Sequence, residues 1–364
     1  MFERAKKVTA PLAGLVVPLL AVSACGGADE AAPADGGGLR VVASTNVWGD
    51  VVRAVGGDAV EVTSIIDDVN VDPHSYESSP AEAAEVADAD LVIYNGGGYD
   101  AFMENLVANT DAPVIQAVRT AEDGAEEGEE RPAPAQGGEE EHAGHEDGAE
   151  GGDHAHDGEE HGDEAGHGEE HGDEAGHGDE GGDPHAGHDH SGNEHIWYDV
   201  HAVHDVAEAV SAELGELVPD QAEAIDGRAQ DLGSELEGIE ERIAAVSEAH
   251  SGDEVLSFDP IPQYLLEEGG LDDLAPEEFL TALEAGNDPP ASAVADVQDL
   301  IDEGEPRVVL HNPQTESGVT RQLRERAEGN GIPVVEISEL VPADTDYATW
   351  MGGQVDALAE ALES

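Results

Sequence analysis

The chain has 364 residues, with 13 Lys and Arg against 85 Asp and Glu, and its formal net charge at pH 7 is -72. A surface this acidic repels phosphate groups, which argues against nucleic acid and against electrostatic adhesion to anionic lipid. The single cysteine, Cys25, leaves the chain without an internal disulfide or a thiolate metal centre.

The first residues carry the pattern of a secreted lipoprotein. Basic Arg4, Lys6 and Lys7 precede an apolar stretch, residues 8–22, that is shorter than the about 20 residues of a membrane span. We therefore interpret residues 1–24 as a signal peptide. The sequence VSAC that ends at Cys25 resembles a bacterial lipobox, which predicts a lipid on Cys25 and an extracytoplasmic protein anchored to the outer face of the cell membrane. Residues 25–38 read as a flexible tether.

The next segment alternates short β-branched runs with helical patterns, as βαβ units do. Ser79, Pro80 and Glu82 form a start signal in which Ser79 caps the helix, Pro80 suits its first turn and Glu82 completes a capping box. The predicted strands are 39–44, 60–66, 91–94 and 113–116, and the predicted helices are 47–55, 80–87 and 100–108.

Residues 121–193 form a tract rich in Glu, Asp, Gly, His and Ala that lacks any helix or strand period. The ten residues EEHGDEAGHG occur twice in succession, at 159–168 and 169–178. Such a segment buries too little apolar surface to offset the entropy of ordering, so we predict that it is disordered. Its histidines are His142, His145, His154, His156, His161, His167, His171, His177, His185, His188 and His190.

Order is predicted to resume at Glu194 with a helix at 203–218, which Pro219 interrupts. Asp220 with Glu223 is expected to cap a second, long helix that reaches about Ala249. A second βα series follows, with strands 254–258, 307–311 and 333–337 and helices 261–268, 276–285, 291–303, 316–328 and 347–362.

The predicted fold class is therefore α/β, with two parallel-sheet lobes joined by one long helix and the disordered insertion in the first lobe. We expect the first lobe to span residues 39–218, the linking helix 219–250 and the second lobe 251–364. Ligands of open α/β sheets bind at the carboxyl ends of the strands, so the functional site is expected in the cleft between the lobes.

Four segments place a side chain that can bind metal near that cleft, two in each lobe. They are DPHSYE with His74, NEHIWYD with His195, SFDP with Asp259 and ISEL with Glu339. Pro73 stiffens the loop that presents His74.

Together with the lipobox and the long helix, these segments look like the zinc and manganese solute-binding proteins of bacterial ABC importers. HNPQTESGVT at His311 and ISELVPADTDYATWM at Glu339 resemble one branch of that family. The resemblance implies a metal receptor, not an enzyme, that works as a monomer with a membrane permease as its partner.

The resemblance also implies a four-residue metal site of His74, His195, Asp259 and Glu339. Asp259 stands where many zinc receptors of the family have a third histidine, and Glu336 is the alternative to Glu339 if the register shifts by one turn. Two imidazoles and two carboxylates suit Zn²⁺ and also Mn²⁺.

Two further features bear on the metal and its ligands. His311 and Asn312 follow a strand and are expected to donate hydrogen bonds that orient the ligands. The histidine-rich tract favours zinc, because imidazoles hold manganese poorly, and we interpret the tract as a zinc collector.

Three other functions remain open at this point. A zinc chaperone or sensor outside transport would share the fold, and a surface adhesin would use an exposed face. A metallohydrolase would need an open coordination position and a free general base, whereas four protein ligands make a closed site.

Overall fold

The structure of the protein is a computed structural model that describes residues 38–121 and 192–364. The predicted signal peptide, Cys25, the tether up to residue 37 and all eleven histidines of the tract lie outside the described residues. The described residues, 38–121 and 192–364, belong to one compact unit. The boundaries at residues 219 and 251 therefore stay predictions.

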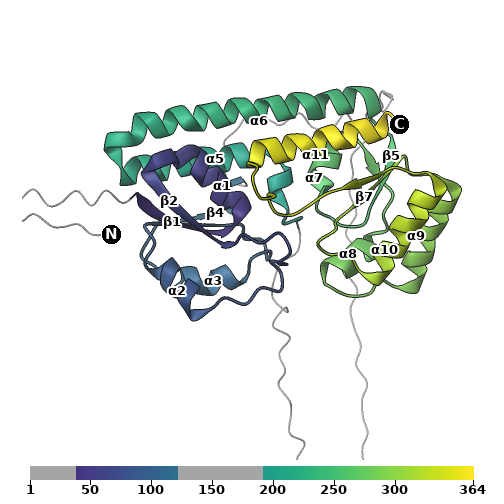
Figure 1. Cartoon of the computed structure of the whole chain (residues 1–364), viewed down its shortest axis with the longest axis horizontal. Helices are drawn as coiled ribbons and strands as arrows, with labels where there is room; N and C mark the ends of the chain where they lie inside the picture. Colours follow the sequence, from purple (N-terminus) through teal and green to yellow (C-terminus); the bar gives the residue numbers. More distant parts are fainter. Residues whose placement is uncertain (1–37, 122–191) are drawn as a thin grey trace, which may run out of the picture. The chain divides into compact units, whose positions relative to one another are not determined.

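The first sheet is parallel, with the strand order β2-β1-β3-β4. Side chains alternate between its faces, so Val41 and Ala43 join one core cluster and Val42 joins another. Helices α1 and α5 cover one face, and α2 and α3 cover the other (Figure 1). The elements are β1 Leu39–Thr45, α1 Asn46–Gly56, β2 Val60–Ile66, α2 Pro80–Ala87, β3 Leu91–Tyr94, α3 Phe102–Val107, β4 Val114–Gln116 and α5 Val200–Leu217.

The second sheet is also parallel, with the strand order β6-β5-β7-β8. Helices α8, α9 and α10 cover one face, whereas α7 and α11 cover the other. The elements are β5 Glu254–Ser257, α7 Gln263–Glu268, β6 Asp272–Asp273, α8 Glu277–Glu284, α9 Ala291–Glu303, β7 Val308–His311, α10 Gly318–Asn330, β8 Val334–Glu336 and α11 Tyr347–Leu362. The two parallel sheets confirm the predicted α/β fold.

The long helix α6, Ala222–His250, has 29 residues and connects the two sheets. It packs on α1 and α5 beside the first sheet and on α7 and α11 beside the second (Figure 1). One continuous hydrophobic core, which includes Val41, Leu236 and Leu310, runs from one sheet to the other. The buried stripe of α6 is Ile225, Leu232, Gly233, Leu236, Ile239, Ile243 and Val246.

Most start signals and strand runs are confirmed, and two local details differ. The Ser79 hydroxyl accepts a hydrogen bond from the Glu82 N–H at 3.3 Å, as predicted for a capping box. The predicted cap at Asp220 is wrong, because Pro219–Gln221 form a separate 3-10 turn and α6 begins after it. The edge strand β6 was not predicted, because its two aspartates lack the apolar signature of a strand.

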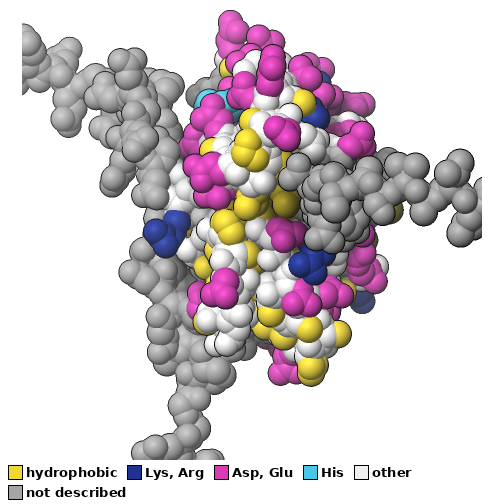
Figure 2. Space-filling view, turned by 90° about the vertical axis from the view of Figure 1, so that its left-hand side faces the viewer, with side chains coloured by type: hydrophobic (Ala, Val, Ile, Leu, Met, Phe, Trp, Pro, Cys, Tyr) yellow, Lys and Arg dark blue, Asp and Glu magenta, His cyan; other side chains and the backbone are white. Residues whose placement is uncertain are grey.

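The surface is acidic in the described part of the chain too. Figure 2 shows Asp and Glu side chains spread over one face, with few Lys or Arg side chains among them. Among residues 38–121 and 192–364, no helix combines the length and the apolar character needed to cross a bilayer.

Arg228 of α6 forms hydrogen bonds with the carboxyl end of α1. Its Nε donates to the Val55 carbonyl and its Nη2 to the Gly56 carbonyl, each at 2.7 Å, so it satisfies two carbonyls at the end of that helix. Arg228→Ala is expected to lower the free energy of unfolding by about 2 kcal/mol, measured by urea denaturation.

Arg242→Ala is the matched control, because this arginine of the same helix makes an exposed ion pair with Asp356 at 3.1 Å. Its removal is expected to cost less than about 1 kcal/mol. Equal effects of the two substitutions would contradict the anchoring role of Arg228.

Candidate metal site

The predicted ligands follow the carboxyl ends of strands or border the tract. His74 lies in the loop between β2 and α2, Asp259 follows β5 and Glu339 follows β8. His195 precedes a 3-10 turn, Ile196–Tyr198, that leads into α5. Asp259 and Glu339 are 7% and 3% exposed, and His195 is 1% exposed, so these polar side chains are buried.

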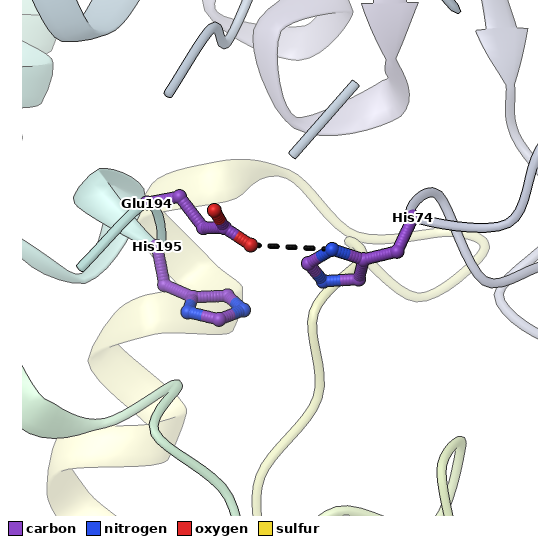
Figure 3. A group of neighbouring side chains, drawn as sticks. All are labelled: His74, Glu194 and His195. Carbon is purple, nitrogen blue, oxygen red and sulfur yellow. Dashed lines mark ion pairs between the residues drawn. The ribbon is translucent and has the colours of Figure 1, made fainter. Parts of the chain in front are cut away.

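His74 and His195 lie beside a third side chain, Glu194 (Figure 3). The His74 Nδ1 is 3.2 Å from the Glu194 Oε1, and one ligand atom from each of the three residues lies within 4.8 Å of the others. The two imidazole ring centres are 6.0 Å apart. Asp259 and Glu339 lie outside this three-residue group.

The loop that carries His74 is fixed by short-range hydrogen bonds. The Asp72 carboxylate accepts from the His74 N–H at 2.9 Å and from the Ser75 hydroxyl at 3.1 Å. The Gln314 side chain donates to the Val69 carbonyl and accepts from the Glu339 N–H at 2.7 Å. Gln314 thus connects the His74 loop to the backbone of Glu339.

Asn193 sets the tautomer of His195. Its Oδ1 accepts from the His195 N–H at 3.0 Å and lies 2.7 Å from the ring Nδ1, while its Nδ2 donates to the Pro260 carbonyl at 2.8 Å. Because Oδ1 can only accept, the Nδ1 of the neutral ring carries the proton. The Nε2 of His195 is therefore the nitrogen that keeps a lone pair for a metal ion.

Asp259 and Glu339 are tied together by Asn312. The Asn312 Nδ2 lies 3.2 Å from Asp259 Oδ2 and 3.0 Å from Glu339 Oε1, and donates to both. The Thr315 hydroxyl also donates to Asp259 Oδ2, at 3.0 Å. The two carboxylates are therefore held against the same Asn312 amide group.

Tyr99 contacts both halves of the site. Its hydroxyl donates to Glu339 Oε2 at 3.3 Å, and its ring lies 5.0 Å from the His74 ring and 5.8 Å from the His195 ring. The loop reaches this position through Gly96, Gly97 and Gly98, whose φ angles of 83°, 67° and 100° favour glycine. Tyr99 therefore contacts Glu339 and both imidazoles.

The electrostatics of the site disfavour uncompensated negative charge. Burial raises the pKa of Glu194 to about 8, with the charges of Glu284 and Asp100 adding to the effect. Burial, together with the neighbouring charge of Asp259, raises the pKa of Glu339, and burial raises the pKa of Asp259. Burial lowers the pKa of His195 well below its usual value, so this ring is neutral. A cation is the natural complement of this set.

His311, Asn312 and Glu336, which the sequence analysis also singled out, differ in their contacts and exposure. The His311 Nε2 lies 3.2 Å from Glu316 Oε2, so its ring contacts Glu316, whereas Asn312 contacts the two buried carboxylates. Glu336 is exposed within β8. Glu194 was not among the predicted ligands, although it directly precedes His195 and lies in one group with both histidines.

The sequence from residue 41 to residue 361 matches the family described as zinc-uptake complex component A, periplasmic. The chain belongs to this family. Its members are metal-binding solute receptors of ABC transporters.

Curated relatives match part of the chain. It is 35% identical over 116 residues to the manganese-binding lipoprotein MntA of Halalkalibacterium halodurans. The aligned region covers 32% of this chain and 38% of the relative. It is 32% identical over 126 residues to the manganese ABC transporter substrate-binding lipoprotein PsaA of Streptococcus pneumoniae, covering 33% and 40%. The matched region is less than half the length of either relative.

Solved structures match nearly the whole chain in fold. The periplasmic zinc binding protein TroA of Treponema pallidum superposes with a TM-score of 0.61 at 14% identity, over 90% of this chain and 99% of that one. Zn(II)-bound AdcA of Streptococcus pneumoniae has a TM-score of 0.59 and 16% identity, over 90% of this chain and 58% of that one. FpvC of Pseudomonas aeruginosa in complex with Mn²⁺ has a TM-score of 0.59 and 18% identity, over 90% of this chain and 98% of that one. At these identities the likeness shows the shared fold.

The raised carboxyl pKa values predict that metal binding releases protons. At pH 7, a carboxyl group with a pKa near 8, such as Glu194, is mostly protonated, and an incoming cation displaces the proton. We expect release of about one proton per ion at pH 7, less release at pH 9, and a metal affinity that rises from pH 6 to pH 8.

Isothermal titration calorimetry in buffers with different ionisation enthalpies measures this release. Binding heats that are independent of the buffer at pH 7 would show that the carboxyl groups are already ionised in the metal-free protein.

Proposed function

We propose that the protein is the extracytoplasmic receptor of a metal ABC importer that binds one zinc ion and delivers it to the membrane permease. The proposed ligands are His74, His195, Asp259 and Glu339, and a lipid on Cys25 is proposed as the membrane anchor. The observation that carries this proposal is the contact of Tyr99 with both imidazoles and with Glu339, which Asn312 joins to Asp259.

The charges of this set support a divalent cargo. Two neutral imidazoles and two carboxylates carry a total charge that balances Zn²⁺ or Mn²⁺. The carboxylates are buried, and their described partners are neutral donors such as Asn312, Thr315 and Tyr99. A bound divalent ion would supply the missing positive charge.

Zinc is proposed over manganese because the chain carries eleven further histidines in its tract. Imidazole ligands favour zinc over manganese in the affinity order of divalent metals. Manganese is the alternative cargo, and the names of the relatives MntA and PsaA favour it.

Metal analysis of site variants tests the proposed ligands. After dialysis against a chelator, the parent protein is expected to keep one zinc ion per chain and to prefer zinc when equal zinc and manganese are offered. Asp259→Asn and Glu339→Gln are each expected to weaken zinc binding by about 100-fold, because each removes a charged ligand from a closed site.

Glu336→Gln provides the matched control, because Glu336 is exposed on β8 only three residues before Glu339. It is expected to leave the affinity unchanged. Retention of one tightly bound ion by both site variants would show that the proposed ligand set is wrong.

The tract is proposed to collect zinc for the site. Replacing its eleven histidines by glutamine keeps the length and the acidic charge of the tract. Zinc titration is expected to show loss of the ions bound beyond the first, while the single tight site stays. If the stoichiometry were the same before and after the replacement, the tract would not collect zinc.

A further inference from the structure

Glu194 is a buried carboxylate that the four-residue site leaves without a role. Its side chain is 5% exposed, and its ion-pair partner is His74, at 3.2 Å (Figure 3). No arginine within the described ranges pairs with it. Since a neutral imidazole does not compensate the charge of a buried carboxylate, the position of Glu194 suits a positively charged ligand.

The backbone holds Glu194 in this place. The Asn95 side chain donates to the Glu194 carbonyl at 2.8 Å, and the Ile196 N–H donates to the same carbonyl at 2.9 Å. Asn95 is itself fixed, because its Oδ1 accepts from Trp48 Nε1 at 3.1 Å and its N–H donates to the Asp100 carboxylate at 2.7 Å. The backbone of Glu194 is therefore held beside Asn95, the residue that follows β3 of the first sheet.

The spacing of the three side chains fits one small cation. Around a zinc ion with bonds of about 2.0–2.2 Å, neighbouring ligand atoms of a tetrahedral site are roughly 3.3–3.6 Å apart. His74 Nδ1 and Glu194 Oε1 are already 3.2 Å apart, and the ligand atoms of all three residues lie within 4.8 Å of one another. Small side-chain rotations would bring His195 Nε2 to the same ion.

We propose that Glu194 is a metal ligand, and that His74, Glu194 and His195 form a landing site that takes the ion before Asp259 and Glu339 engage it. This inference rests on the proposed metal receptor function. All three residues belong to segments beside the first sheet, so the landing site needs no ligand from the second sheet. An ion held there has one or more positions left for the two remaining carboxylates.

The test uses the full chain with the eleven tract histidines replaced by glutamine, so that the cleft is the site observed. Zinc affinity is measured by competition with a colorimetric chelator. The double variant Asp259→Asn/Glu339→Gln is expected to keep one weaker zinc site, and adding Glu194→Gln to lower that affinity by about tenfold or more. Adding Glu85→Gln, which removes the same charge from an exposed position of α2, is expected to change nothing.

Cobalt(II) provides a second measurement that a purely structural role would not affect. Its visible absorption reports the ligands around the ion, and Glu194→Gln is expected to change the spectrum in the parent and in the double variant. If Glu194→Gln does not fold, as judged by circular dichroism, Glu194→Asp takes its place, because its shorter carboxylate withdraws from the ion and is expected to produce the same loss.

Two results would overturn the landing site: a double variant that binds no zinc, or a Glu194 variant with unchanged zinc affinity and cobalt spectrum. Failure of the proposed function is a different result, since the parent would then lack a tight zinc site before any change at Glu194.

Discussion

Three carboxylates, Glu194, Asp259 and Glu339, are buried beside the two sheets, and no arginine of the described residues pairs with them. Lysine is unavailable, because the chain has none after Lys7. The described hydrogen-bond donors to Asp259 and Glu339 are neutral, so they would not compensate the charge of these carboxylates when ionised. A divalent cation at the proposed metal site would supply the compensating charge, and Asn312 holds Asp259 and Glu339 beside each other.

The framework joins the segments that carry His195 and Glu339 by direct hydrogen bonds. The Tyr198 hydroxyl donates to the Ser338 carbonyl at 2.9 Å, and the Tyr347 hydroxyl donates to the Trp197 carbonyl at 2.6 Å. The Tyr198–Ser338 bond lies within three residues of His195 and of Glu339, and Trp197 lies two residues after His195. These bonds restrict the relative movement of the backbone segments that carry His195 and Glu339. The side chain of His74, at 25% exposed, marks the more open side of the site.

The sequence was sufficient for the fold because its signals were local. The strand at 60–66 and the helices at 80–87, 291–303 and 347–362 have the predicted bounds, since apolar periodicity and caps specify them directly. The two residues of β6 could not be predicted, because Asp272 and Asp273 become a strand only by pairing with β5.

The site was predictable to a lesser degree, because it depends on contacts between distant segments. His74 and His195 could be singled out as residue types in loops, but their grouping with Glu194 requires the packing of Asn95 against the Glu194 backbone, 99 residues away. The bridging role of Asn312 likewise follows from the approach of β7 to β8, and not from any local pattern.

The anchoring of Asn193 to Pro260 fixes the point at which the histidine-rich tract rejoins the described part of the chain. His190 precedes His195 by five residues, so their Cα atoms are at most about 18 Å apart. A metal ion bound by a histidine tethered over so short a stretch of chain has an effective concentration of roughly millimolar order at the cleft. In the proposed collector role, the transfer of an ion from tract to cleft is thus an intramolecular step whose rate does not depend on how much protein the membrane carries.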